Sequence, residues 1–249
     1  MNKRNIILIL CLLFILCFLV FLILYRVKNN FTNKWDSKNS DKNYNNTIIG
    51  YFHICQKENW EKSFDMILQK VKQSGLYDIM DEIRLGIVND DGVIINDERL
   101  NDPKIHIIYV GKSDEYERPT LLHMKNATSD PEDTLYFYLH TKGIRHYNTH
   151  NEKDILQWIN DMLYWNIEKW QYSVEILQEK ETYGCNYNGI HYSGNFWWTT
   201  KNHVKKLPPK IGDKYTDPED WILKNKDNMF CVNNCPDNYK PPYPDNLYP

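Results

Sequence analysis

Several features that would assign a function directly are missing from this sequence of 249 residues. Its 30 basic and 33 acidic residues give a net charge of −3, so it lacks the basic excess that a nucleic-acid-binding protein needs. The hydrolase motifs Gly-x-Ser-x-Gly and His-Glu-x-x-His are absent, which leaves a hydrolase with little support. Internal repeats are also absent. These absences exclude classes of function without selecting one.

Cysteine is scarce, with six residues: Cys11, Cys17, Cys55, Cys185, Cys231 and Cys235. The first two lie inside an apolar run and are interpreted as packing residues. The other four allow three disulfide pairings in an oxidising compartment, and the sequence does not choose among them. The last two lack a second close cysteine pair, which disfavours a zinc site.

The apolar run covers residues 6–25, an unbroken stretch of 20 residues. At about 1.5 Å of rise per residue, such a helix spans a hydrocarbon core of roughly 30 Å. The run is longer than the apolar region of a cleaved signal peptide and has no small-residue cleavage site. We therefore expect a signal anchor after a short cytoplasmic tail (residues 1–5), with a cleaved signal as the alternative.

Basic residues are balanced across the run, so they barely discriminate between orientations. The short N-terminal tail favours a type II single-pass protein with its C-terminal part in a secretory lumen or viral membrane compartment. Three glycosylation sequons, which begin at Asn30, Asn45 and Asn126, agree weakly with this orientation. Residues 26–46 are polar and read as a stem, and residues 47–249 are long enough for one domain.

Hydrophobic patterning in this domain alternates between strands and helices. Expected strands are Ile48–Cys55, Glu82–Val88, Lys104–Val110, Thr134–Leu139, Thr182–Asn186 and Asn195–Thr200. Expected helices follow Trp60 as far as Ser74-Gly75, cover Thr120–Asn126, and run about seven turns from an Asn151 cap to Leu177. This order predicts an α/β fold with a mainly parallel central sheet, in which ligands bind outside the carboxyl ends of the strands.

Two candidate binding segments follow from this rule. His140-Thr-Lys-Gly143 ends the fourth strand, where Lys142 and Arg145 offer positive charge to a phosphate and Gly143 allows close backbone approach. His191-Tyr-Ser-Gly-Asn-Phe-Trp-Trp198 adds short polar groups and two tryptophans. Because side chains alternate along a strand, one of these tryptophans can pack in the core while the other lines a pocket. A solvated basic loop and ordinary packing are the alternatives.

A third segment, Asp217-Pro-Glu-Asp-Trp-Ile222, begins a helix with proline in the first turn. Its acidic residues either complement the helix dipole or include a base that deprotonates an acceptor hydroxyl.

Together these segments resemble a group of small glycosyltransferase-like proteins of large DNA viruses, microbial eukaryotes and bacteria, related to GT-A nucleotide-sugar transferases. The resemblance rests on Leu139-His-Thr-Lys-Gly143, His191-Tyr-Ser-Gly-Asn-Phe-Trp-Trp198 and Glu219-Asp-Trp221, and it runs from about residue 48 to residue 230. It implies a single GT-A-like domain that binds a nucleotide-sugar donor and transfers the sugar to a hydroxyl of a glycan or protein acceptor.

The resemblance also suggests roles for individual residues. Most GT-A enzymes bind Mn²⁺ or Mg²⁺ through Asp-x-Asp, but the sequence has no Asp-x-Asp, and the His140–Lys142 segment stands in its place. Lys142 is therefore expected to stabilise the leaving diphosphate, and Glu219 or Asp220 to act as base. Expected substrate-binding residues are His140, Arg145, His191, Ser193, Asn195, Trp197, Trp198, Asp90 and Asp91. Asn89, Asp90 and Asp91 are candidates either for nucleotide contact or for a weaker Mn²⁺ or Mg²⁺ site. The missing Asp-x-Asp also motivates an alternative, a catalytically inactive carbohydrate-binding or structural membrane protein.

Overall fold

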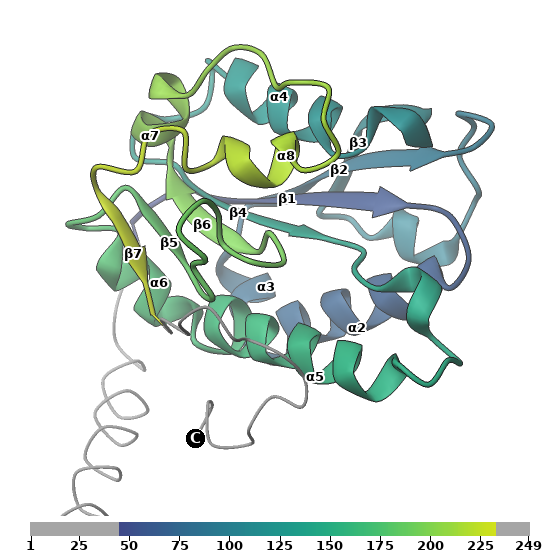
Figure 1. Ribbon diagram of the computed structural model, residues 1–249. Helices are drawn as coiled ribbons and strands as arrows, with labels where there is room; N and C mark the ends of the chain where they lie inside the picture. The colour runs from purple at the N-terminus through teal and green to yellow at the C-terminus, as the bar shows by residue number, and fades with distance from the viewer. Residues whose placement is uncertain (1–44, 233–249) are drawn as a thin grey trace, which may run out of the picture. The chain divides into compact units, whose positions relative to one another are not determined.

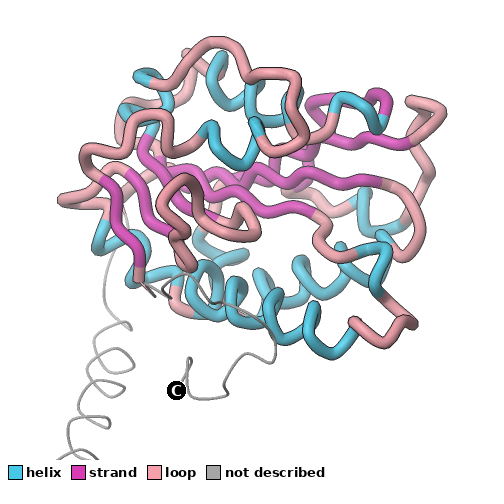
Figure 2. Tube along the Cα trace, viewed as in Figure 1, coloured by secondary structure: helices cyan, strands magenta, loops and turns pink. Residues whose placement is uncertain are grey.

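The computed structural model describes residues 45–232. Its strands are β1 (Ile48–Cys55), β2 (Glu82–Asn89), β3 (Ile105–Lys112), β4 (Leu135–His140), β5 (Thr182–Gly184), β6 (Trp197–Thr200) and β7 (Met229–Cys231). They form one seven-stranded sheet in the order β3-β2-β1-β4-β6-β5-β7. Helices cover both faces of this sheet (Figures 1 and 2). The expected α/β class is confirmed.

The helices form two layers. On one face lie α2 (Trp60–Gln73), α3 (Leu76–Ile79), α5 (Glu152–Leu163) and α6 (Trp170–Ile176). On the other lie α4 (Arg118–Asn126), α7 (Lys201–Lys206) and α8 (Asp217–Trp221) (Figure 1). Short 3-10 turns cover Glu98–Asn101, Ser113–Glu115 and Ile144–His146. Because both faces are covered, the central strands β1 and β4 are almost entirely buried, whereas the edge strand β3 is largely accessible.

The sheet is mainly, but not wholly, parallel. The strands β3, β2, β1 and β4 run parallel to one another, and β5 runs parallel to β7. The strand β6 runs antiparallel to both β4 and β5. From β1 the chain builds the sheet outward through β2 and β3, and then returns to place β4 on the opposite side of β1. The carboxyl ends of β1 and β4 therefore flank a topological switch point, where doubly wound sheets usually bind ligands.

The expected long helix from residue 151 to residue 177 is interrupted. Between α5 and α6 lies a π-helical turn, Tyr164–Glu168. The Asn166 side chain donates to the Met162 carbonyl at 2.9 Å, and the Asn166 carbonyl accepts the Trp198 indole N–H at 2.7 Å. Packing against the sheet thus gives the Asn166 carbonyl a partner outside the helix, whereas a continuous α-helix pairs its carbonyls with its own backbone N–H groups.

Asn151 stands at the N-cap position of α5, as predicted, but its side chain does not cap the helix. The Asn151 backbone is helical, with φ −89° and ψ −4°, and its side chain makes no capping hydrogen bond. Instead, the Glu152 carboxylate accepts from the Asn148 backbone N–H at 3.0 Å. A side chain caps a helix from an extended backbone, which Asn151 does not adopt.

Among residues 45–232, no helix combines the length and apolar character needed to cross a membrane. The predicted anchor, residues 6–25, lies outside the described residues, as does the predicted stem up to residue 44.

Candidate ligand-binding site

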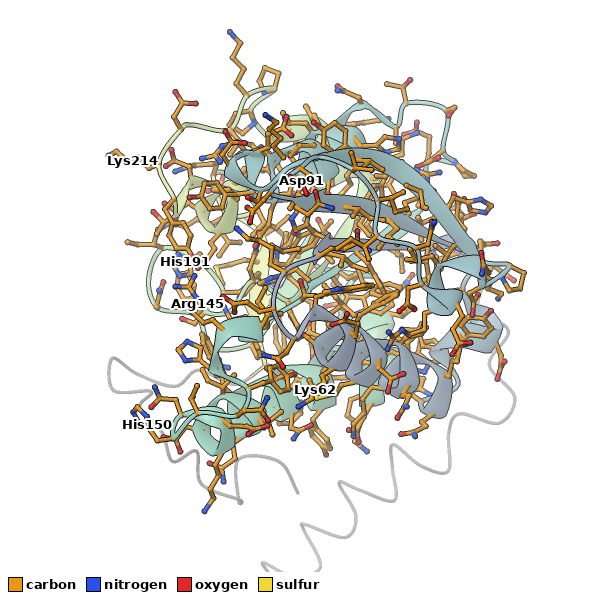
Figure 3. The ribbon with its side chains drawn as sticks, turned by 90° about the vertical axis from the view of Figure 1, so that its right-hand side faces the viewer. Lys62, Asp91, Arg145, His150, His191 and Lys214 are labelled. Atoms are coloured by element: carbon orange, nitrogen blue, oxygen red, sulfur yellow. The ribbon has the colours of Figure 1, made fainter. Side chains whose placement is uncertain are left out.

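A cavity of about 730 Å³ lies at the carboxyl ends of β1 and β4. Its wall includes the ends of both strands, the loop from Thr141 to His146, and parts of α5 and α8. Figure 3 looks onto this edge of the sheet and labels Arg145 and His191 there. The cavity therefore occupies the switch point at which the fold is expected to bind a ligand.

The loop after β4 is fixed to its neighbours by hydrogen bonds. The backbone N–H of Thr141 donates to the His53 carbonyl at 3.0 Å, and its hydroxyl accepts from the Cys55 N–H at 3.0 Å. The N–H of Lys142 donates to the Ser63 hydroxyl at 3.1 Å. These contacts fix the backbone of the loop, and Lys142 lines the cavity at the carboxyl edge of the sheet, where the sequence predicted it to lie.

Lys142 is a partly desolvated cation. Its Nζ lies 4.3 Å from the centre of the Trp158 ring, a cation–π contact. Burial lowers the pKa of Lys142, while the carboxylates of Glu219 and Glu117 oppose that shift. Because charges interact more strongly away from bulk water, this ammonium is well placed to attract an anion entering the cavity. Trp158, on α5, also lines the cavity.

Gly143 gives the loop its shape. Its φ is +68°, and a Cβ built there would lie 2.3 Å from Cγ2 of Ile155 on α5. Gly75 has a similar φ of +75° but no atom within 4 Å of such a Cβ, which makes it a matched control.

We expect Gly75→Ala to cost about 1 kcal/mol, because a side chain disfavours this backbone conformation. Gly143→Ala should cost roughly 1–3 kcal/mol more, because Ile155 must also move. Urea unfolding of both variants measures the difference. Equal destabilisation would show that the close contact with α5 is unimportant.

The two motif segments meet beside this loop. Nε2 of His140 donates to the Gly194 carbonyl at 3.0 Å, and Nδ1 of His140 lies 3.4 Å from the Glu117 carboxylate. The side-chain amide of Asn195 donates to Glu117, and its carbonyl accepts the Trp197 indole N–H at 2.7 Å. Asn195 is buried and therefore orients Glu117 rather than lining the cavity, which corrects its expected contact with substrate.

The paired tryptophans also differ from the expectation. Trp197 stacks on Tyr138 at 4.9 Å and Trp198 on Phe137 at 4.8 Å, on opposite faces of the sheet as strand alternation predicts. Both are at most 1% exposed, and neither lines the cavity. The expectation that one of them stacks on a ligand is therefore not met. Ser193 does not line the cavity either.

Carboxylates and a histidine gather where α8 approaches the cavity. Glu219 lines the wall. His191 lies between this residue and Asp220: its Nε2 is 3.3 Å from Glu219 Oε2, and its Nδ1 is 2.9 Å from Asp220 Oδ1. Asp220 and His191 do not line the cavity themselves. The arrangement makes His191 and Asp220 positioning residues for the Glu219 carboxylate.

The acidic turn after β2 has a different role from the one predicted. Asn89 accepts the backbone N–H groups of Gly92 and Val93 and so shapes the turn. Asp90 pairs with Lys57 and accepts from Ser113 at 2.7 Å, and these two contacts lower its pKa. Lys57 and Ser113 line the cavity, but Asp90 and Asp91 do not. Asp90 therefore influences the cavity only through Lys57 and Ser113.

Several cavity residues were not predicted from the sequence: Lys57, Tyr116, Glu117, Tyr215 and His53. His53 and Lys57 could have been predicted, because His53 lies near the carboxyl end of β1 and Lys57 follows just after that end. Glu117 and Tyr116 stand before α4 in a polar stretch that carries no motif. Tyr215 lies in the loop before α8, where only the tertiary fold brings it to the cavity.

His53 should make stability depend on pH. Its Nδ1 lies 2.9 Å from the Thr120 hydroxyl, and burial lowers the pKa of His53 from 6.5 to about 4. Glu117 opposes this shift, and His140 adds to it. Since the unfolded chain takes up this proton more readily, the stabilisation is complete above pH 6.5 and is lost as the pH falls towards about 4.

The contribution of His53 to the slope is at most about 1.4 kcal/mol per pH unit. We expect His53→Asn to have a flatter pH dependence of the unfolding free energy than the wild type over this range. Parallel curves would contradict the assignment of a neutral buried imidazole.

In the described part of the chain, no group of three or more His, Cys, Asp or Glu side chains has an arrangement that could hold a metal ion; the His191, Glu219 and Asp220 cluster is not such a group. The Lys142 ammonium, on the loop after β4, would repel a divalent cation close to it. Cys55 and Cys185 are free thiols, and Cys235 lies outside the described residues.

No protein-family model matches the sequence, and no curated protein matches it significantly. The structure itself shows the class of the protein, which is α/β with a mainly parallel sheet.

Proposed function

We propose that this protein is a membrane-anchored glycosyltransferase of the GT-A-like type, which moves a sugar from a nucleotide-sugar donor to a hydroxyl of a glycan or protein. The observation that carries the proposal is the cavity at the switch point, where the cation of Lys142 and the carboxylate of Glu219 share one wall. An inverting transfer from a sugar diphosphate uses both charges: a positive group stabilises the leaving phosphate, and a base deprotonates the acceptor.

The cationic part of the cavity suits the donor diphosphate. Lys142, Arg145 and Lys57 line it from the ends of β4 and β1. In the proposed reaction the bond between the anomeric carbon and the phosphate oxygen breaks, and the diphosphate leaves with the electron pair. A fixed ammonium in a partly desolvated site stabilises this developing charge without reorganisation of water.

The carboxylate part of the cavity suits the acceptor. In an inverting reaction Glu219 accepts the acceptor hydroxyl proton while that oxygen attacks the anomeric carbon. His191 and Asp220 restrict the orientation of Glu219 through the contacts at 3.3 and 2.9 Å. His140 and Glu117, whose side chains lie 3.4 Å apart, line the same cavity.

In this proposal the ammonium of Lys142 takes the place of Mn²⁺ or Mg²⁺. The proposed protein is of type II: residues 6–25 anchor it in the membrane, and the cavity faces the lumen.

Donor hydrolysis by the full-length protein in detergent tests the proposal. The substrates are UDP-, GDP- and CMP-linked sugars, each with and without Mn²⁺, and free nucleotide is measured. We expect slow release from at least one donor without added metal. If no donor is hydrolysed or transferred to any acceptor, while disaccharides still bind, the catalytically inactive carbohydrate-binding protein is the better account.

A further inference from the structure

Two tyrosines at the cavity carry the next inference. Tyr116 is 40% exposed and Tyr215 is 63% exposed, although both are large aromatic residues that usually bury most of their surface. Both line the cavity. Their ring centres are 5.3 Å apart and their planes are nearly perpendicular, at 84°. They form a pair, called here the tyrosine platform.

The platform is held in place by its surroundings. The Tyr116 backbone has φ +51°, an uncommon conformation for a residue with a side chain. The Arg118 guanidinium lies 5.5 Å from the centre of the Tyr116 ring and donates to the carbonyls of Gly212 and Lys214, each at 2.7 Å. The Asp217 carboxylate accepts the Lys214 backbone N–H at 2.8 Å. Arg118 thus ties the loop that carries Tyr215 to the segment that carries Tyr116.

A preorganised, accessible aromatic pair loses little conformational entropy when a ring packs against it. Sugar rings present C–H faces to aromatic rings and hydroxyl groups to neighbouring carboxylates. Glu117 and Glu219 line the same cavity as the platform and provide such carboxylates. A neutral polyhydroxylated ring therefore matches the chemistry of the tyrosine platform and the two carboxylates.

We propose that the tyrosine platform is the acceptor subsite, which binds a neutral sugar ring of a glycan beside the Glu219 carboxylate. This inference rests on the proposed function and adds the class of acceptor and its position. A nucleobase would also stack on tyrosine. The Arg145 guanidinium and the carboxylates of Glu219 and Glu117 all act on Tyr215, so charge does not separate a base from a sugar here, and the nucleotide arm of the test does.

The test measures carbohydrate and nucleotide binding separately in the full-length protein. Saturation-transfer NMR with millimolar lactose, cellobiose, mannobiose and diacetylchitobiose reports sugar binding, and calorimetry with UDP and GDP reports nucleotide binding. Tyr215→Ala removes one ring of the platform, and Tyr215→Phe keeps it. The control, Ile190→Ala, truncates another exposed apolar side chain, 61% exposed and outside the cavity.

We expect at least one disaccharide to bind, with affinity about tenfold lower in Tyr215→Ala and nearly unchanged in Tyr215→Phe and Ile190→Ala. Nucleotide affinity should stay within about twofold in all variants. Three results would overturn the inference: no disaccharide binds the wild type, Tyr215→Ala binds disaccharides as well as the wild type, or Tyr215→Ala loses nucleotide affinity instead. Disaccharide binding that depends on Tyr215, without nucleotide binding or donor hydrolysis, would support the subsite and contradict the proposed transferase.

Discussion

Replacing Lys142 with alanine is expected to lower kcat/KM for donor hydrolysis or transfer by about 10²–10³-fold. The ammonium faces the cavity and packs at 4.3 Å over the Trp158 ring, so its loss leaves the leaving diphosphate without its principal cation. Steady-state kinetics with the best donor measures the effect. The melting temperature should change little, because burial already disfavours the charged form of this side chain.

Two variants make this result specific. Lys142→Arg keeps the charge and should retain more activity than the alanine variant. Lys153→Ala, which removes an exposed lysine from α5 outside the cavity, should behave like the wild type. If Lys142→Ala loses as much melting temperature as a core truncation such as Phe64→Ala, its low activity would reflect unfolding, and the assignment would fail.

Replacing Glu219 with glutamine is expected to lower the rate of transfer by about 10²–10⁴-fold, because the amide does not accept the acceptor proton. The shape of the side chain and the approach of α8 are preserved. UDP or GDP should therefore bind with nearly unchanged affinity, which calorimetry measures. The signature is a loss of turnover without a loss of nucleotide binding.

Asp220→Asn probes the same carboxylate indirectly. Its effect should be smaller, since Asp220 contacts His191 and does not line the cavity. Glu98→Gln, at an exposed position outside the cavity, serves as the matched control. Full transferase activity in Glu219→Gln would remove this residue from the chemistry.

Much of the fold could be predicted because its central strands are continuous apolar runs. The predicted strand Ile48–Cys55 matches β1, and the expected helix after Trp60 ends at Gln73, just before Ser74-Gly75. In both elements, the positions of the apolar residues in the sequence match the positions that are buried in the structure. The three-residue strand β7 and the short helix α7 were missed, because such short elements are stabilised by their neighbours rather than by their own pattern.

The site was predicted only in part. The predicted residues that line the cavity are Lys142, His140, Arg145 and Glu219. Their position could be predicted because strand ends and helix starts, which the sequence indicates, lie at the edge of the sheet. The His191–Trp198 segment meets the same loop, but its side chains orient other residues rather than the ligand. Strand alternation gives the face on which a tryptophan lies, but not whether another ring covers it, and both tryptophans are covered by rings of β4.

A crystal structure of the protein with bound UDP or GDP tests the central claim most directly. The predicted result is a diphosphate in the cavity at the carboxyl ends of β1 and β4, with its oxygens in contact with Nζ of Lys142. A nucleotide bound elsewhere, or one whose phosphates lie away from Lys142, would contradict the account.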